Sequence, residues 1–191
     1  TIQSKGGSTE TSSYFSQLNY DFNHKYFISA NLRVDGSANF APDDQYAFFP
    51  GISVGWDLSR ESFLAGTSHW LDQLKIRAGY GQTGNDSPKG MAVSSAYTDW
   101  YAPGANTMWG NAVIAGVKLA RLGNPNLKWE TTNTFNGGLD YSFLNGRLLG
   151  SFDFYVSNTK DLLMSRSVPY MNGYRSIMDN IGSTRNIGLE F

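Results

Sequence analysis

Hydrophobic and polar positions alternate along the chain from Tyr26 to Asp35. The even positions of this run are apolar or aromatic and nearly all odd positions are polar, as in a β-strand, because successive side chains point to opposite faces. Residues 16–22 alternate in the same way, and Asn23-His24-Lys25 joins the two runs as a tight turn. Each run has about ten residues, the length with which a tilted strand crosses a bilayer. The pattern predicts a hairpin over residues 13–35 with one apolar and one polar face.

Alternation of the same kind recurs along the rest of the chain. Pro50 is expected at a strand start or a bulge, because proline cannot donate to the ladder. Asn145-Gly146 is a strong hairpin signal. Together with the hairpin the runs predict about seven strands in an all-β, antiparallel, up-and-down meander. The further strands are predicted at Pro50–Leu58, Asp72–Gln82, Trp129–Phe143, Leu148–Ser157 and from about Arg185 onward.

Short and long connections alternate between the predicted strands. The short ones are centred on His24, near Ser62 and on Gly146. The connection 59–71 has helical features, with Ser59 as its capping residue. Tight turns on one side and long loops on the other are typical of an outer-membrane β-barrel. Because a closed bacterial barrel has an even number of strands, about seven strands cannot close by themselves and are expected to belong to a larger barrel. The long connections cover residues 36–49, 83–127 and 158–184, the second of them without a clear period.

The composition favours a membrane barrel over a cytosolic enzyme. Charged residues make up 16% of the chain and aromatic residues 15%, with 21 glycines, whereas soluble domains average roughly 25% charged residues. A net charge of −1 argues against nucleic-acid binding, and the absence of cysteine excludes disulfides and thiol chemistry. No apolar run is long enough for a transmembrane helix. Because Thr1 is neither a start methionine nor part of a signal peptide, the chain is expected to be the interior of a longer one.

Two other interpretations fit part of this pattern. A soluble, secreted β-sandwich that binds carbohydrate or mediates adhesion would also alternate, with its apolar face as a core. A passive porin-like barrel would share the strands and the loops. The long strands, the asymmetric loops and the lightly charged polar faces favour the membrane barrel over the sandwich.

Patterns that would indicate catalysis or a metal site are missing from the sequence. His24 and His69 lie far apart in turn-like segments, and no cluster has metal-ligand spacing. Asp43-Asp44 lacks the spaced oxygen ligands that Ca²⁺ needs. Gly79-Tyr80-Gly81 is followed by neither a helix nor the Lys-Ser/Thr of a phosphate loop. The sequence predicts a protein that is not an enzyme and has no metal or cofactor.

Six sequence blocks stand in order along nearly the whole chain: 33–37, 49–56, 74–81 with 83–85, 124–130, 158–163, and 180–182 with 185–190. Together these blocks resemble the SusC/RagA-like, TonB-dependent outer-membrane transporters. The resemblance implies a 22-stranded barrel with an N-terminal plug, of which residues 1–191 are a partial barrel domain without the plug, the TonB box and the remaining strands. Since the family has further strands after the last block, Phe191 is expected to be a truncation point.

The same resemblance implies a function and partners. Such proteins lie in the outer membrane of Gram-negative bacteria, in contact with its lipids, and import bulky nutrients, chiefly glycans and sometimes peptides. TonB supplies the energy, and a SusD-like surface lipoprotein covers the barrel as a lid. Nucleic acid is not among the expected partners.

Two groups of residues are candidates for contact with cargo or plug. The aromatic residues of the long segment 83–127 could stack on sugar rings while polar neighbours bind hydroxyls, or could pack within the loop or against the lid: Trp100, Tyr101, Trp109, Asp99 and Asn106. Charged residues on the polar faces are expected to face the lumen, where they could form a polar path or hold the plug, although a structural role is the simpler account for each: Arg33, Asp35, Lys75, Arg77, Asp153 and Glu190.

Overall fold

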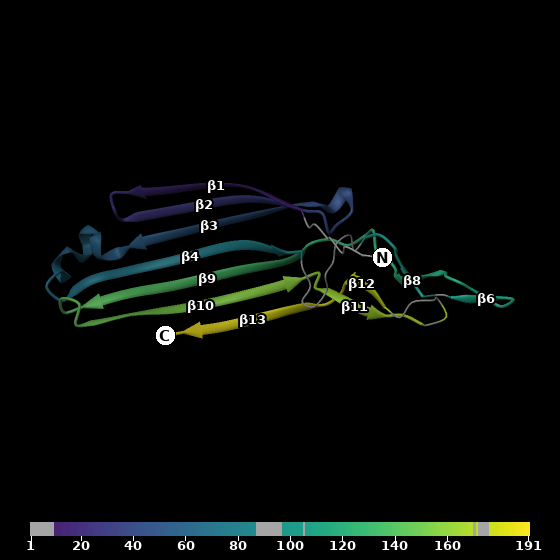
Figure 1. The fold of residues 1–191 in the computed structure, drawn as a ribbon. Helices are drawn as coiled ribbons and strands as arrows, with labels where there is room; N and C mark the ends of the chain where they lie inside the picture. Colours follow the sequence, from purple (N-terminus) through teal and green to yellow (C-terminus); the bar gives the residue numbers. More distant parts are fainter. Residues whose placement is uncertain (1–9, 87–96, 105, 170, 172–175) are drawn as a thin grey trace.

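The computed structural model describes residues 10–86, 97–104, 106–169, 171 and 176–191, which are built mainly of β-strands. Seven strands form one antiparallel sheet in the order β1-β2-β3-β4-β9-β10-β13 (Figure 1). The sheet is thus a meander, and it confirms the predicted all-β fold and its seven strands. Their bounds are β1 Thr11–Phe22, β2 Tyr26–Ser37, β3 Tyr46–Asp57, β4 Leu71–Asn85, β9 Glu130–Phe143, β10 Leu148–Lys160 and β13 Ser183–Glu190.

Strand β3 begins earlier than alternation predicts, at Tyr46 instead of Pro50. Phe48 and Phe49 are adjacent and apolar, so the period of two is hidden there, and Phe49 is buried in a core at the end of the sheet. Pro50 lies inside β3, so the expected strand start is wrong. Proline is tolerated because β3 pairs with β2 at this position while its pairing with β4 begins only at Gly51.

The register gives the sheet two chemically different faces, because directly paired residues of antiparallel strands point the same way. The large side chains of the apolar face are mostly exposed. The described residues contain no second large sheet that covers this face, so they do not form the two-layer core that the β-sandwich interpretation requires. One row of paired residues crosses all seven strands and is apolar throughout: Leu18, Ala30, Ile52, Tyr80, Phe135, Val156 and Ile187.

The two ends of the sheet differ in their connections (Figure 1). The connections from β1 to β2, β3 to β4 and β9 to β10 lie at one end, which we call the turn end; the first and the last are tight turns, whereas the second covers residues 58–70. The opposite end, which we call the loop end, has the connection 38–45 and the two longest connections, 86–129 and 161–182. Parts of two of them form small two-stranded sheets, β5 with β8, β6 with β7 and β11 with β12. No helix in the described part of the chain is long and apolar enough to cross a membrane.

The small sheets correct the expectation that segments 83–127 and 158–184 are loops only. Strands of three to five residues are too short for a period of two to be recognised in the sequence. The bounds of these strands are β5 Trp100–Pro103, β6 Thr107–Trp109, β7 Ala112–Ile114, β8 Val117–Arg121, β11 Leu163–Ser167 and β12 Ser176–Asn180.

Three short 3₁₀ helices complete the described elements: η1 (Pro42–Asp44), η2 (Leu58–Arg60) and η3 (Ser62–Thr67). The last two form the connection from β3 to β4 and confirm its helical character. Ser59 is not the cap of this connection, however. Asp57 caps η2, because its Oδ1 accepts from the backbone N–H of Ser59 at 3.2 Å, and Arg60 Nε donates to its Oδ2 at 3.2 Å.

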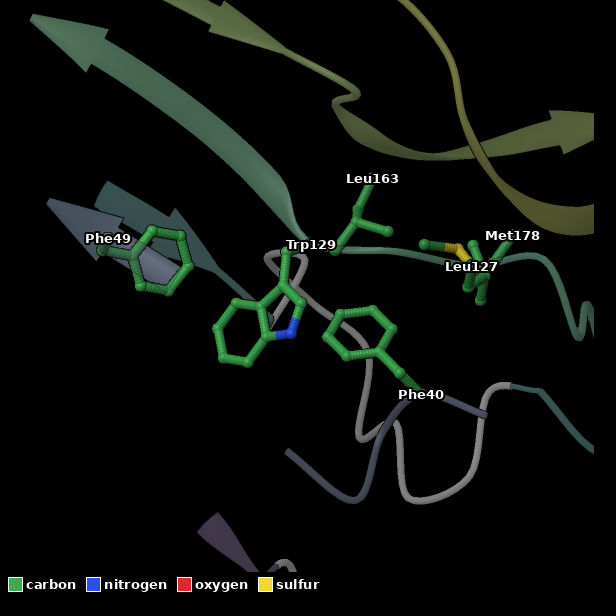
Figure 2. Packing of buried hydrophobic residues seen from close by; sticks show 6 residues of the cluster. All are labelled: Phe40, Phe49, Leu127, Trp129, Leu163 and Met178. Carbon is green, nitrogen blue, oxygen red and sulfur yellow. The ribbon is translucent and has the colours of Figure 1, made fainter. Parts of the chain in front are cut away.

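A cluster of buried hydrophobic side chains closes the loop end of the sheet (Figure 2). The Trp129 ring lies near two other rings, with centroid distances of 5.3 Å to Phe40 and 5.5 Å to Phe49. Its Nε1 donates to the backbone oxygen of Gln45 at 3.1 Å. The cluster therefore joins the three connections of the loop end, which are far apart in sequence. Its members are Phe40, Phe49, Leu127, Trp129, Leu163 and Met178.

Candidate functional site

All six charged residues that were expected to face a lumen lie on the polar face of the sheet. Arg33 and Asp35 share the side of β2 on which Phe27 lies, and Lys75 shares the side of β4 on which Arg77 lies, because they are separated by even numbers of residues. One row of directly paired residues connects these strands with the remaining two charges: Phe27, Gly55, Arg77, Gly138, Asp153 and Glu190. The register thus brings charges from four strands, β2, β4, β10 and β13, onto one face.

Arg77 is the centre of an ion-pair network on this face. Its guanidinium forms a bidentate pair with Asp140, with Nε–Oδ2 and Nη2–Oδ1 distances of 2.8 Å. Nη2 also donates to Asp153 Oδ1 at 3.0 Å. Gly138 of β9 is paired directly with Arg77 of β4 on one side and with Asp153 of β10 on the other. A Cβ at this position would be 2.5 Å from Asp153 Oδ1 and 2.9 Å from Arg77 Cζ. The missing side chain is therefore what allows Arg77 to span two strands.

Asp140 was not among the candidates from the sequence. Its side of the sheet can be read from the alternation of the sequence, because Leu139 and Tyr141 belong to the apolar face and Asp140 between them must lie on the polar face. The pairing of Asp140 with Arg77 could not be predicted, because the predicted meander makes these two strands neighbours but does not fix their register.

The other two basic candidates are also held within the sheet. Lys75 Nζ lies 4.2 Å from the centre of the Phe27 ring, a distance at which a cation is attracted to the ring face. Arg33 Nε donates to Asp35 Oδ2 at 2.7 Å, and its guanidinium lies 5.9 Å from the Phe49 ring centre. The three cations therefore have partners on the face itself.

An uncharged hollow lies on the polar face toward the loop end. It has a volume of about 420 Å³ and is lined in part by Gln17, Asn31 and Asn136. The Asn31 amide lies over Gly51, where a Cβ would overlap its oxygen, and Asn136 Oδ1 would be 2.6 Å from a Cβ at Gly79. Amide side chains offer both donors and acceptors, so the hollow presents a neutral hydrogen-bonding surface.

Two asparagines of the sequence blocks hold the loop end together. Asn124 Nδ2 donates to the Met178 backbone oxygen at 2.9 Å. Asn180 Nδ2 donates to the backbone oxygens of Lys128 and Asp161 at 2.8 Å each, and its Oδ1 accepts from the Lys128 N–H at 2.9 Å. These two asparagines thus have a structural role, because their hydrogen bonds connect β11–β12 to the segment before β9.

The five candidates of the long segment lie on or beside the small sheets β5–β8 and β6–β7, which we call the arm (Figure 1). Tyr101 is 58% exposed, Trp109 is 79% exposed and Asn106 is exposed. Asp99 Oδ1 accepts from the Gly123 N–H at 2.9 Å and so supports the fold of the arm. The Trp100 backbone belongs to β5, but its side chain lies outside the described part.

The exposed rings of Tyr101 and Trp109 belong to different small sheets of the arm, β5–β8 and β6–β7. No ring contact joins Tyr101 and Trp109 among the described residues. The two exposed rings are instead separate features of a β-structured projection from the loop end.

A family model described as "TonB dependent receptor-like, beta-barrel" matches residues 2–191. The chain belongs to this family. Among curated relatives, TonB-dependent receptor P3 of Formosa agariphila is 38% identical over 96% of this chain and 18% of its own length. TonB-dependent receptor SusC of Bacteroides thetaiotaomicron is 37% identical over 94% of this chain and 18% of its own length.

The solved structures agree with this family assignment. The chain resembles "Structure of the RagAB peptide transporter" with a TM-score of 0.81 and 30% identity, over 95% of this chain and 19% of that one. A siderophore receptor, PirA of Pseudomonas aeruginosa, shares only the fold, with a TM-score of 0.59 at 15% identity. The chain spans about a fifth of the length of the curated relatives that it matches.

Proposed function

We propose that this chain is part of a TonB-energised importer in the outer membrane of a Gram-negative bacterium, which takes up bulky nutrients. The observation that carries the proposal is the two-faced sheet. One face is apolar across all seven strands, as a surface toward lipid requires, and the other holds paired charges and amide groups. The family membership of residues 2–191 supports the same function.

The orientation follows from the asymmetric ends. Outer-membrane barrels have short periplasmic turns and long extracellular loops, so the turn end lies at the periplasm and the arm projects outside the cell. The polar face then lines the lumen, and the six candidates Arg33, Asp35, Lys75, Arg77, Asp153 and Glu190 face the plug of the complete 22-stranded barrel. Because Arg77 and Arg33 are already paired within the sheet, their main role is to shape the wall.

Two protein partners belong to the proposal. TonB acts through the plug region, and a SusD-like lipoprotein covers the loop end as a lid. The structural relatives described as the RagAB peptide importer, in "closed-closed" and "open-open" states, support a lid that opens and closes. Among the described residues, those of the arm extend furthest from the sheet at the loop end (Figure 1).

The cargo is a glycan or a peptide. Trp109 and Tyr101 have exposed rings that suit stacking on sugar rings or on peptide side chains, with Trp100, Asn106 and Asp99 nearby in sequence. The amide-lined hollow of the polar face would then offer hydrogen bonds to a neutral polar cargo during its passage.

Uptake by cells tests the proposal. A strain without the gene is complemented with the complete protein, and cells receive fluorescein-labelled peptides or fluorescein-labelled starch oligosaccharides. We expect cell-associated fluorescence to depend on the gene and to disappear when a protonophore removes the proton gradient. Uptake that resists the protonophore would instead identify a passive porin, and absence of the protein from the outer-membrane fraction would overturn the proposal.

A further inference from the structure

The connection between β3 and β4 is unlike the other two connections of the turn end. Residues 23–25 and 144–147 are tight turns, whereas residues 58–70 contain two 3₁₀ helices. No Asp, Glu, Lys or Arg occurs from Ser62 to Leu71. A periplasmic connection that only faced water would need neither this length nor this absence of charge.

Glu61 fastens the start of the connection to aromatic residues of the apolar face. Its Oε1 accepts from Tyr26 Oη at 2.7 Å and from Trp56 Nε1 at 3.1 Å, and Lys25 Nζ donates to its Oε2 at 3.2 Å. Tyr26 and Trp56 are directly paired residues of β2 and β3 whose rings are stacked. The Glu61 side chain is only 13% exposed, and its charge is balanced by Lys25.

The far end of the connection is fixed to the same aromatic band. The Trp70 ring stacks on Phe143, with a centroid distance of 5.8 Å and an interplanar angle of 15°. The Leu144 N–H donates to the Trp70 backbone oxygen at 2.8 Å. Phe143 belongs to the apolar face of β9, since it shares that side with Tyr141 and Leu139. Both ends of the connection are therefore bound where the apolar face meets the turn end.

Between these two points the connection has an inner and an outer side. Residues three apart lie above one another in a 3₁₀ helix, and Glu61, Leu64 and Thr67 form a half-buried row. Phe63, which lies outside that row, is 66% exposed. Ser62, Ala65 and Gly66 are also exposed, as are Ser68, His69 and Trp70 after the helix. The outer side is therefore formed by small, aromatic and uncharged polar residues together with one histidine, without Asp, Glu, Lys or Arg.

We propose that this connection is an in-plane membrane anchor, with Phe63 inserted into the interfacial region of the bilayer leaflet at the turn end. Aromatic residues of a membrane protein concentrate at the level of the lipid headgroups, and both attachment points of the connection belong to such a band. A bilayer interface accepts an apolar side that lies parallel to it. The outer side of the connection is continuous with the apolar face of the sheet, so the same lipid that contacts this face would contact the connection.

Spin labels on the complete protein, in lipid nanodiscs and in a background without other cysteines, test this inference. Phe63→Cys carries the label at the proposed anchor. Arg147→Cys, in the tight turn at the same end, is the aqueous control, and Leu32→Cys, within the apolar face, is the lipid control. Collision rates are measured with oxygen, which concentrates in lipid, and with a water-soluble nickel chelate. A band shift on boiling verifies that each labelled protein is folded.

We expect the label at residue 63 to collide several-fold less often with the nickel chelate than the label at residue 147, and more often with oxygen. A nickel collision rate equal to that at residue 147 would overturn the anchor. The inference rests on the membrane placement in the proposed function, and the Leu32 label separates the two. If that label is also open to nickel, the membrane placement itself fails.

Discussion

Arg77 reaches Asp153 across the whole width of strand β9, because the residue between them is Gly138. The Nη2–Oδ1 distance is 3.0 Å, and the same guanidinium holds Asp140 of β9 in a bidentate pair. One cation thereby fixes three strands relative to one another on the polar face. The arrangement depends on a single missing Cβ, which makes it open to direct test.

Gly138→Ala is expected to weaken this network. The new Cβ would lie 2.5 Å from Asp153 Oδ1, so the guanidinium must move away and the hydrogen bond to Asp153 is lost. A hydrogen bond to a charged group contributes about 1.5–3 kcal/mol, and partial exposure of both partners places the loss at the lower end. The midpoint of thermal unfolding, followed on gels as loss of the unboiled band, should fall.

Gly137→Ala is the matched control for this substitution. It is the adjacent glycine of β9, and the nearest atom to its Cβ would be a backbone oxygen at 3.8 Å. It should leave the midpoint unchanged or raise it slightly. Equal midpoints for the two alanine variants would contradict the role assigned to Gly138.

Trp129 is expected to be essential for the loop end. Trp129→Ala removes a buried ring between Phe40 and Phe49 and should lower the free energy of unfolding by about 3–5 kcal/mol. Trp129→Phe keeps a ring but loses the hydrogen bond to the Gln45 oxygen, which contributes about 1 kcal/mol. Trp109→Ala, at an exposed tryptophan, serves as the control. If Trp129→Ala were as stable as Trp109→Ala, the cluster would not hold the loop end.

Glu61 should make stability depend on pH. Hydrogen bonds from Tyr26, then Trp56 and Lys25, hold the pKa of its carboxyl below the ordinary value of 4.5. Because the folded pKa lies below the unfolded one, this stabilisation is complete above the ordinary value and is lost as the pH falls through the folded pKa. Glu61→Gln should therefore have a lower thermal midpoint than the wild type at neutral pH, and the difference should shrink on acidification.

The control for Glu61→Gln is Asp43→Asn, which neutralises an exposed carboxylate at the loop end. Its effect on the midpoint should be small and should not change with pH in this way. If the difference in thermal midpoint between the wild type and Glu61→Gln stayed constant down to strongly acidic pH, the charge of Glu61 would not be what stabilises the connection.

Sequence alternation was sufficient to predict the sheet, because one face is apolar and the other polar, and every long strand therefore alternates with a period of two. It predicted the side of the sheet for Arg77 and Asp153 for the same reason. It could not predict that Gly138 separates them, since a register between strands depends on pairing and not on either strand alone.

Other features had no local signal in the sequence. The core around Trp129 brings together three connections that are distant in the chain, and strands β5–β8 are too short to show a period. The sequence gives no signal for the contacts of Glu61 either, because its three partners come from the β1–β2 turn and from two strands.

Trp109 provides the sharpest test of the proposed cargo contact, since its ring is 79% exposed on the arm and substitution should not disturb the fold. Trp109→Ala is expected to lower uptake of the labelled peptides or oligosaccharides several-fold, with an unchanged unfolding midpoint. Met108→Ala, which removes the adjacent and similarly exposed side chain, should have little effect. Co-purification of the lid lipoprotein is measured in parallel. Reduced uptake with normal lid binding supports contact with cargo, whereas loss of the lid assigns Trp109 to lid docking, and uptake equal to that of Met108→Ala contradicts the cargo contact.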